Sequence, residues 1–130
     1  MIYSRIFYHV ILTTYKRKPH IDAALEQLIY RAIRDELQSR GSKLCYVNGT
    51  QDHVHILMHL DASDAVSEVV RTISTITQDI AKASNPGFLW QEGYAVLSVS
   101  HHHYKGLIHY IREQKIRHTR GTTRKEHEAP

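Results

Sequence analysis

The stretch that decides the fold runs from Gln51 to Leu60 and reads Gln-Asp-His-Val-His-Ile-Leu-Met-His-Leu. Apolar residues alternate along it, a pattern typical of a β-strand with one buried face. Because strand side chains alternate between two faces, the apolar residues share one face and the histidines share the other. The apolar set is Val54, Ile56, Met58 and Leu60, and the histidine set is His53, His55 and His59. Two imidazoles two residues apart on one face are a candidate metal-binding pair, although a merely polar sheet face would look the same.

The composition limits the class of protein. A chain of 130 residues is expected to form one domain, and its net charge of +4 suits an anionic partner such as nucleic acid. A single cysteine excludes an internal disulfide framework and fits a reducing cytosol, so a cytoplasmic location is expected. No apolar run reaches the ~20 residues of a membrane-spanning helix, so no membrane partner is expected.

The segments on either side of this strand predict an α+β fold. Strands and helices are expected in the order β-α-β-β-α-β, which is the ferredoxin-like (RRM-like) plan of a four-stranded antiparallel sheet with two helices on one face. Asp22 is a plausible N-cap of the first helix, and Gly41 a stop signal after it. The expected ranges are Arg5–Thr14, Asp22–Arg40, Lys43–Asn48, Val54–Leu60, Ser63–Ala83 and Tyr94–Ser100.

A third helix is expected beyond the sheet, at about His102–Arg117, and it would carry Tyr110 and Gln114. At 100° per residue these two side chains lie within about 40° of each other. Tyr110 sits beside the apolar stripe of the helix, so it is expected to be at least partly accessible. If this helix crosses the open face of the sheet, His53, His55 and Gln114 could form a three-ligand metal site with Tyr110 one helical turn away.

Such an arrangement suits phosphodiester chemistry. A tyrosine hydroxyl is a weak nucleophile at neutral pH because its reference pKa is about 10. A divalent metal ion, Mg²⁺ or Mn²⁺, would polarise a phosphodiester and offset the charge that develops on attack. The covalent phosphotyrosine formed would conserve the bond energy, so the strand could be rejoined without ATP.

A basic loop, Tyr15–Pro19, follows the first strand and contains Lys16, Arg17 and Lys18. These three cations are predicted to contact a nucleic-acid backbone. The alternative is an ordinary solvated loop.

Several of these segments together resemble a known family. His53-Val54-His55, preceded by Asp52, resembles the signature of the HUH (His-hydrophobic-His) endonucleases. Three further segments resemble the small single-tyrosine transposases of bacterial insertion sequences, and with the opening strand and its basic loop the resemblance covers about residues 3 to 118. These segments are Trp90–Tyr94, Ser98–Ser100 and Tyr110–Gln114.

The resemblance implies a function and a set of residues. It implies a single catalytic domain over residues 1–118. The polar and charged composition of residues 119–130 predicts a flexible tail after that domain. The resemblance also implies cutting and rejoining of single-stranded DNA beside hairpins at the ends of an insertion sequence, by a homodimer with possible composite active sites. Tyr110 would be the nucleophile, and His53, His55 and Gln114 would bind the metal ion. His118 stands where the family commonly has a paired His-His, and no role is assigned to it, to His59 or to His101–His103.

Three other interpretations stay open. A domesticated relative could nick repeated hairpins in the chromosome with the same residues. A non-catalytic domain could bind single strands by stacking bases on exposed aromatics of the sheet. A structural metal-binding protein would explain the histidines but leave Tyr110 and Gln114 as coincidence.

Overall fold

The computed structural model describes residues 7–99 and 104–113, and within them it confirms the β-α-β-β-α-β order and the added helix. A short 3-10 turn, η1 (Tyr15–Arg17), occupies the basic loop. The predicted tail, residues 119–130, lies outside the described residues, so the domain boundary at residue 118 stays a prediction. The elements are β1 (Phe7–Thr13), α1 (Ala23–Ser39), β2 (Lys43–Gly49), β3 (His53–His59), α2 (Val66–Ser84), β4 (Ala95–Val99) and α3 (Tyr104–Arg112).

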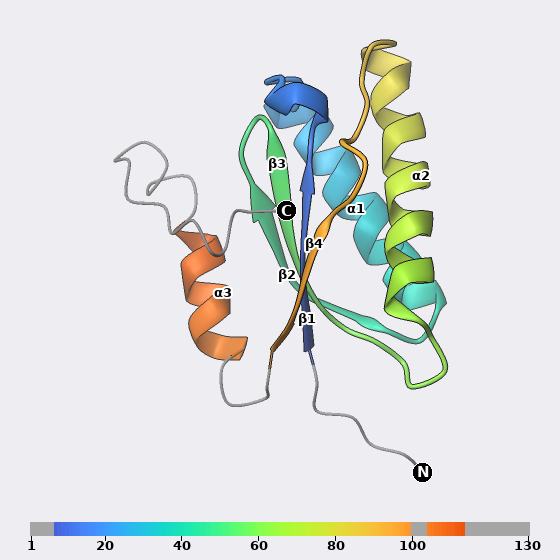
Figure 1. The fold of residues 1–130 in the computed structure, drawn as a ribbon, viewed down its shortest axis with the longest axis vertical. Helices are drawn as coiled ribbons and strands as arrows, with labels where there is room; N and C mark the ends of the chain where they lie inside the picture. Colours follow the sequence, from blue (N-terminus) through green and yellow to red (C-terminus); the bar gives the residue numbers. More distant parts are fainter. Residues whose placement is uncertain (1–6, 100–103, 114–130) are drawn as a thin grey trace.

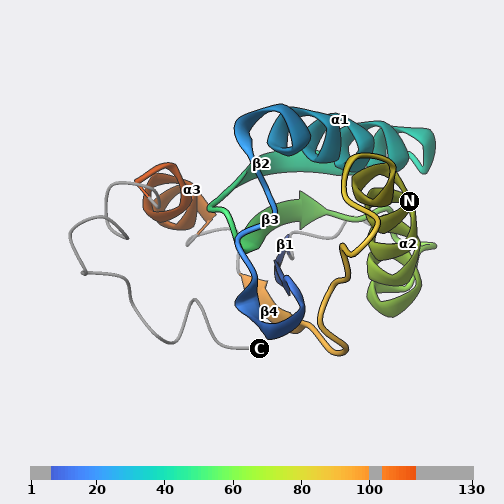
Figure 2. The same cartoon turned by 90° about the horizontal axis from the view of Figure 1, so that it is seen from above.

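The four strands form one antiparallel sheet in the order β2-β3-β1-β4, so β1 and β3 are the central strands. Helices α1 and α2 pack together against one face of this sheet, while α3 lies on the opposite face (Figures 1 and 2). Helix α3 therefore crosses the face that the sequence predicted to be open.

The main core lies between the sheet and the pair α1 and α2. The alternation predicted for β3 is confirmed, because Val54, Ile56 and Met58 belong to this core. The intervening residue Leu57 belongs to a second, smaller cluster on the α3 side. β3 is thus buried on both faces, which is why it contains so few exposed side chains.

Helix α1 begins and ends as the sequence predicts. The Asp22 carboxylate accepts a hydrogen bond from the backbone N–H of Leu25, so Asp22 is the N-cap. Gly41 follows the helix with φ +75°, and the N–H of Ser42 returns to the carbonyl of Leu37. Glycine fits this left-handed position because it has no Cβ to clash with the backbone.

Helix α2 begins later than predicted. The sequence places its start at Ser63, whereas the helix starts at Val66 after an N-cap residue, Ala65, that makes no side-chain capping bond. Ser63 and Asp61 instead bond to each other in the preceding turn. A local side-chain hydrogen bond of this kind competes with helix capping, and here it forms in place of a cap.

None of the helices in the described part of the chain is long and apolar enough to cross a membrane.

Gly49 is required by a close approach of two backbones at the end of the β2–β3 hairpin. A Cβ built on Gly49 would lie 2.2 Å from the carbonyl oxygen of His53. No real Cβ contact is that short, so any other residue would push the hairpin apart at His53. Gly106, inside α3, has nothing within 4 Å of such a Cβ.

Alanine at these two glycines is expected to have opposite effects. Gly49→Ala should lower the free energy of unfolding by about 1–3 kcal/mol because the hairpin must shift to accept the methyl group. Gly106→Ala should raise the helical propensity of α3, by about 0.5–1 kcal/mol, without a clash. Urea unfolding of both variants measures the difference. Equal stability of Gly49→Ala and the wild-type protein would contradict the close approach.

Candidate active site

His53 and His55 lie side by side on the α3 face of β3 and are buried. Their ring centroids are 5.2 Å apart, with the rings edge to face. His59 shares this face but lies four residues further along, which is about 13 Å in an extended strand. It packs against Phe7 instead, with ring centroids 5.1 Å apart. The pair predicted from the sequence is therefore formed, and His59 is separate from it.

Asp52 anchors the first of these histidines. Nδ1 of His53 lies 2.6 Å from Oδ1 of Asp52, and the hydroxyl of Thr50 donates to the same carboxylate oxygen. The hydrogen bond from His53 lowers the pKa of Asp52 from 3.8 to about 2, and Thr50 and Arg17 act in the same direction against the effect of partial burial. Asp52 is consequently ionised at neutral pH and accepts the Nδ1 proton of His53, so a metal-binding role would fall to Nε2.

A second anchor, His9 on β1, was missed in the sequence. Its Nε2 lies 2.7 Å from Nδ1 of His55, and the two rings are stacked with centroids 5.0 Å apart. Both side chains are buried, with exposed fractions of 1% for His9 and 0% for His55. The signal available in the sequence was a histidine within an apolar strand, because a buried polar side chain needs a partner.

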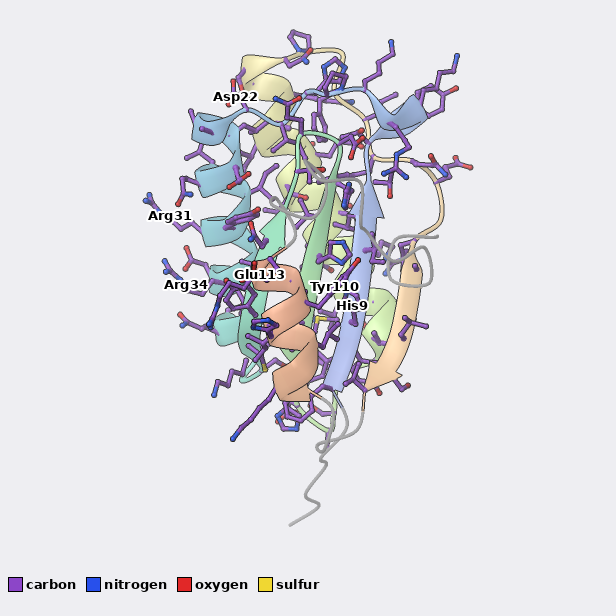
Figure 3. All side chains as sticks on the ribbon, turned by 90° about the vertical axis from the view of Figure 1, so that its left-hand side faces the viewer. His9, Asp22, Arg31, Arg34, Tyr110 and Glu113 are labelled. Carbon is purple, nitrogen blue, oxygen red and sulfur yellow. The ribbon has the colours of Figure 1, made fainter. Side chains whose placement is uncertain are left out.

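Tyr110 reaches this site from α3. Its ring centroid is 6.2 Å from that of His55, and it packs with Leu57, Leu107 and Ile111. Figure 3 looks onto this face and shows α3 in front of the sheet, with Tyr110 pointing toward its centre, where His9 lies. The expectation that Tyr110 would be partly accessible is wrong, since its exposed fraction is 6%. The helix buries a wider stripe than its sequence suggested, because α3 lies across the sheet with Tyr110 inside the contact.

Gln114, the third predicted metal ligand, lies outside the described part of the chain. So do His118 and His101–His103, to which the sequence analysis assigns no role. Among the described residues, no group of three or more His, Cys, Asp and Glu side chains is arranged to hold a metal ion. What is described is two neighbouring imidazoles, each anchored at Nδ1. That donor pair fits a divalent metal ion as part of a larger ligand set.

The basic turn, defined as Tyr15–Lys18, lies next to this site because Thr14 ties it to Asp52. The backbone N–H and the hydroxyl of Thr14 both donate to the carbonyl oxygen of Asp52. The side chains of the turn are exposed, and Nε of Arg17 lies 3.5 Å from the Asp52 carboxylate. Lys16 and Arg17 have φ values of +56° and +52°. Two successive left-handed residues that are not glycine are strained, and such strain persists only where the surrounding structure holds it.

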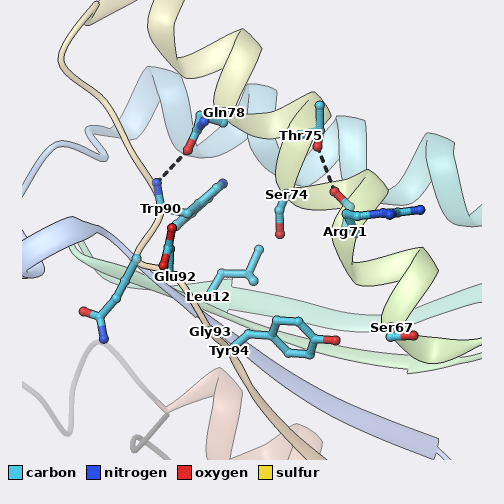
Figure 4. Close-up of a pocket in the computed structure, with 11 residues that line it drawn as sticks. Leu12, Ser67, Arg71, Ser74, Thr75, Gln78, Trp90, Glu92, Gly93 and Tyr94 are labelled. Atoms are coloured by element: carbon cyan, nitrogen blue, oxygen red, sulfur yellow. Dashed lines mark hydrogen bonds between the residues drawn. The ribbon is translucent and has the colours of Figure 1, made fainter.

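A separate pocket of about 450 Å³ lies on the other side of the molecule, between α2 and the segment that leads into β4. Figure 4 shows Arg71, Trp90, Glu92 and Tyr94 around it, and a hydrogen bond from the Trp90 backbone to Gln78. Its wall includes Leu12, which belongs to the core beneath α1 and α2. The pocket is therefore not part of the histidine site.

Comparison with families and with solved structures finds transposases in both cases. The family described as "Transposase IS200 like" matches residues 2–114. A candidate transposase from Deinococcus radiodurans R1 is 23% identical, with a TM-score of 0.66 over 83% of this chain and 89% of that one. A REP-associated tyrosine transposase bound to a REP hairpin is 15% identical, with a TM-score of 0.68 over 92% of this chain and 70% of that one. No curated protein sequence matches.

Asparagine at position 52 is expected to change the response of stability to acid. An aspartate with a lowered pKa in the folded state stabilises the protein above its unfolded-state pKa, and this contribution is lost as the pH falls toward the folded-state value. Between pH 5 and pH 3 the wild-type protein should lose about 1 kcal/mol more unfolding free energy than Asp52→Asn. Urea titrations at the two pH values measure this.

The exposed Asp35 supplies the control for this measurement. Asp35→Asn should keep the wild-type difference between pH 5 and pH 3, because exposed ion pairs contribute little to stability. If Asp52→Asn also keeps the wild-type difference, the Asp52–His53 hydrogen bond does not have the strength assigned to it.

Proposed function

The chain belongs to the IS200-like transposase family, and we propose that it cuts and rejoins single-stranded DNA through a covalent bond to Tyr110. The substrate would be the hairpin-bearing ends of an insertion sequence. His53, His55 and Gln114 would hold a divalent metal ion, Mg²⁺ or Mn²⁺.

The observation that carries this proposal is the contact between Tyr110 and His55. These residues are 55 positions apart in the sequence, and the fold brings their ring centroids to 6.2 Å. A nucleophile must lie close to the groups that orient the phosphate, because positioning supplies much of the rate of such a reaction. A packing tyrosine could have faced any part of the sheet, yet Tyr110 faces one of the two paired histidines.

In the proposed reaction, the Tyr110 oxygen attacks the phosphorus atom, and the bond from phosphorus to the 3′ oxygen breaks. The 5′ side of the break stays on the tyrosine, and the other side leaves with a free 3′-OH. A bound metal ion would polarise the phosphodiester and stabilise the charge that develops on its oxygens. A later attack by a 3′-OH on the phosphotyrosine would reverse the step and rejoin the strand without ATP.

The proposal includes a homodimer whose subunits could exchange tyrosine helices. In the described chain, the ring of Tyr110 lies edge to face against that of His55 in the same subunit. Because the side chain of Tyr110 is buried between α3 and the sheet, a DNA strand would have to displace part of that contact to reach its hydroxyl group.

The basic turn supports the assignment of DNA as the substrate. Lys16, Arg17 and Lys18 are exposed, and Nε of Arg17 lies 3.5 Å from the carboxylate of Asp52, which contacts His53. Cations at this place would hold the phosphate backbone of a strand that enters the site.

A relative that nicks chromosomal repeat hairpins with the same residues is the second candidate. The structural similarity to a REP-associated tyrosine transposase bound to a REP hairpin favours testing hairpins of that kind alongside insertion-sequence ends. A non-catalytic module that stacks bases on its sheet is less well supported. The strand that would present stacking aromatics presents His53 and His55, and α3 covers that face.

Replacing Tyr110 is expected to abolish covalent attachment. The wild-type protein with Mn²⁺ and labelled hairpin oligonucleotides carrying randomised single-stranded flanks should form an adduct that survives denaturation. Tyr110→Phe should form none, because it lacks only the attacking oxygen. Tyr94→Phe is the matched control, since Tyr94 lies at the separate pocket. An adduct with Tyr110→Phe would show that another residue is the nucleophile.

Binding of single-stranded DNA is expected to weaken steeply with salt, and the basic turn should account for part of the slope. Each phosphate contact on a single strand contributes about 0.7 to the slope of log K against log [salt]. The double variant Lys16→Gln/Lys18→Gln should therefore lower the slope by about 1.4. Lys82→Gln on α2, remote from the histidine face, should leave it unchanged. A slope that is the same in all three proteins would remove the basic turn from the DNA interface.

A further inference from the structure

We infer that His9 is a positioning residue that sets the tautomer and ring orientation of His55. This inference rests on the proposed function, in which His55 is a metal ligand. It assigns to β1, a strand that carries none of the proposed ligands, a direct part in preparing the site.

The geometry of the two rings is specific. His9 and His55 are diagonal neighbours on one face of the β1–β3 pair, because His9 pairs with Leu57 and His55 pairs with Ile11. Nε2 of His9 and Nδ1 of His55 are 2.7 Å apart, which is a short hydrogen bond between nitrogens. The rings are also stacked, with an interplanar angle of 23°. One contact thus fixes the direction of the His55 ring, and the central strands fix the contact.

The chemistry of imidazole makes this bond matter for metal binding. With Nδ1 of His55 occupied by His9, the ligand atom of His55 would be Nε2, which binds a metal only through a lone pair. A neutral His55 has that lone pair when its proton is on Nδ1 and is donated to Nε2 of His9. In the opposite tautomer, His9 would donate to His55, and Nε2 of His55 would carry the proton. His9 must therefore act as the acceptor.

Two features argue against ordinary core packing as the reason for His9. The position is 1% exposed, and burial of an imidazole there would be costly without a hydrogen bond. Phe7 and Ile11, its neighbours on the same face of β1, are apolar. A third apolar side chain would pack as well as they do, so the imidazole is explained by its bond to His55.

The test compares two replacements that differ in one property. His9→Gln keeps a hydrogen-bond acceptor at about the reach of Nε2, whereas His9→Phe keeps a stacked ring without an acceptor. Mn²⁺ binding to the DNA-free protein is measured by electron paramagnetic resonance, so the readout does not depend on DNA cleavage. His9→Phe should bind Mn²⁺ 10- to 100-fold more weakly than the wild-type protein, and His9→Gln should come within a few-fold of it.

Ile11→Val and His55→Ala are the controls. Ile11→Val, on the same face of β1, should bind Mn²⁺ as the wild-type protein does, and His55→Ala should not bind it at this site. Wild-type affinity in His9→Phe would overturn the inference. Equal weakening of Mn²⁺ binding in His9→Gln and His9→Phe would also overturn the acceptor role, provided that thermal unfolding shows both proteins to be folded.

The tautomer itself can be read without metal or substitution. Nitrogen-15 chemical shifts of the imidazole rings in the metal-free wild-type protein should show the proton of His55 on Nδ1 and the acceptor nitrogen of His9 at Nε2. A proton on Nε2 of His55 would overturn the inference even if no histidine variant folds. Failure of the proposed function looks different: Mn²⁺ would then bind wild-type protein and His55→Ala equally, or the adduct would persist in Tyr110→Phe.

Discussion

The antiparallel pairing of β3 with β1 places the two histidines of the site and the residues that anchor them. Its register sets Thr13 opposite His53 and Ile11 opposite His55. A slip of one residue would exchange the two faces of β3, sending the histidines into the core beneath α1 and α2 and turning Val54 and Ile56 toward α3. Burial on both faces of β3 makes such a slip costly, because each face then loses its apolar contacts. The hydrophobic effect that stabilises the sheet therefore also fixes the direction in which the two histidines point.

β1 carries the supporting residues because it is the neighbour that this register brings alongside. Near the start of the strand, His9 reaches His55, and just beyond its end Thr14 bonds to Asp52, which in turn bonds to His53. The same strand leads directly into the basic turn, whose first residue is held by the carbonyl oxygen of Leu89. The two histidines on β3 and the exposed cations after β1 are thus both tied to β1, through His9 and Thr14.

Much of this could be predicted from the sequence where the signal was local. The alternation along β3, the Asp22 cap and the Gly41 stop depend on residues within a few positions of one another, and all were confirmed. The failures involve contacts between distant segments. His9 was missed because its partner is 46 positions away, and Tyr110 was judged accessible because its burial depends on how α3 lies on the sheet. The left-handed backbone of Lys16 and Arg17 could not be predicted, because neither residue is a glycine. The predicted ligand Gln114 lies outside the described residues.

One anchor is a carboxylate and the other an imidazole, and their different burial accounts for the choice of side chain. Asp52 stands at the turn before β3 with its side chain 28% exposed, and the hydrogen bond from His53 outweighs this partial burial and keeps the pKa of its carboxyl low. The side chain of His9 is only 1% exposed. An unpaired carboxylate at this position would cost several kcal/mol in lost hydration. A neutral imidazole supplies the same acceptor without that penalty. It also adds no negative charge beside His55, which would otherwise offset the charge of a metal ion that polarises phosphate. In the proposed site, the carboxylate of Asp52 at the solvent edge therefore makes His53 a more basic ligand. A neutral His9 in the interior orients His55.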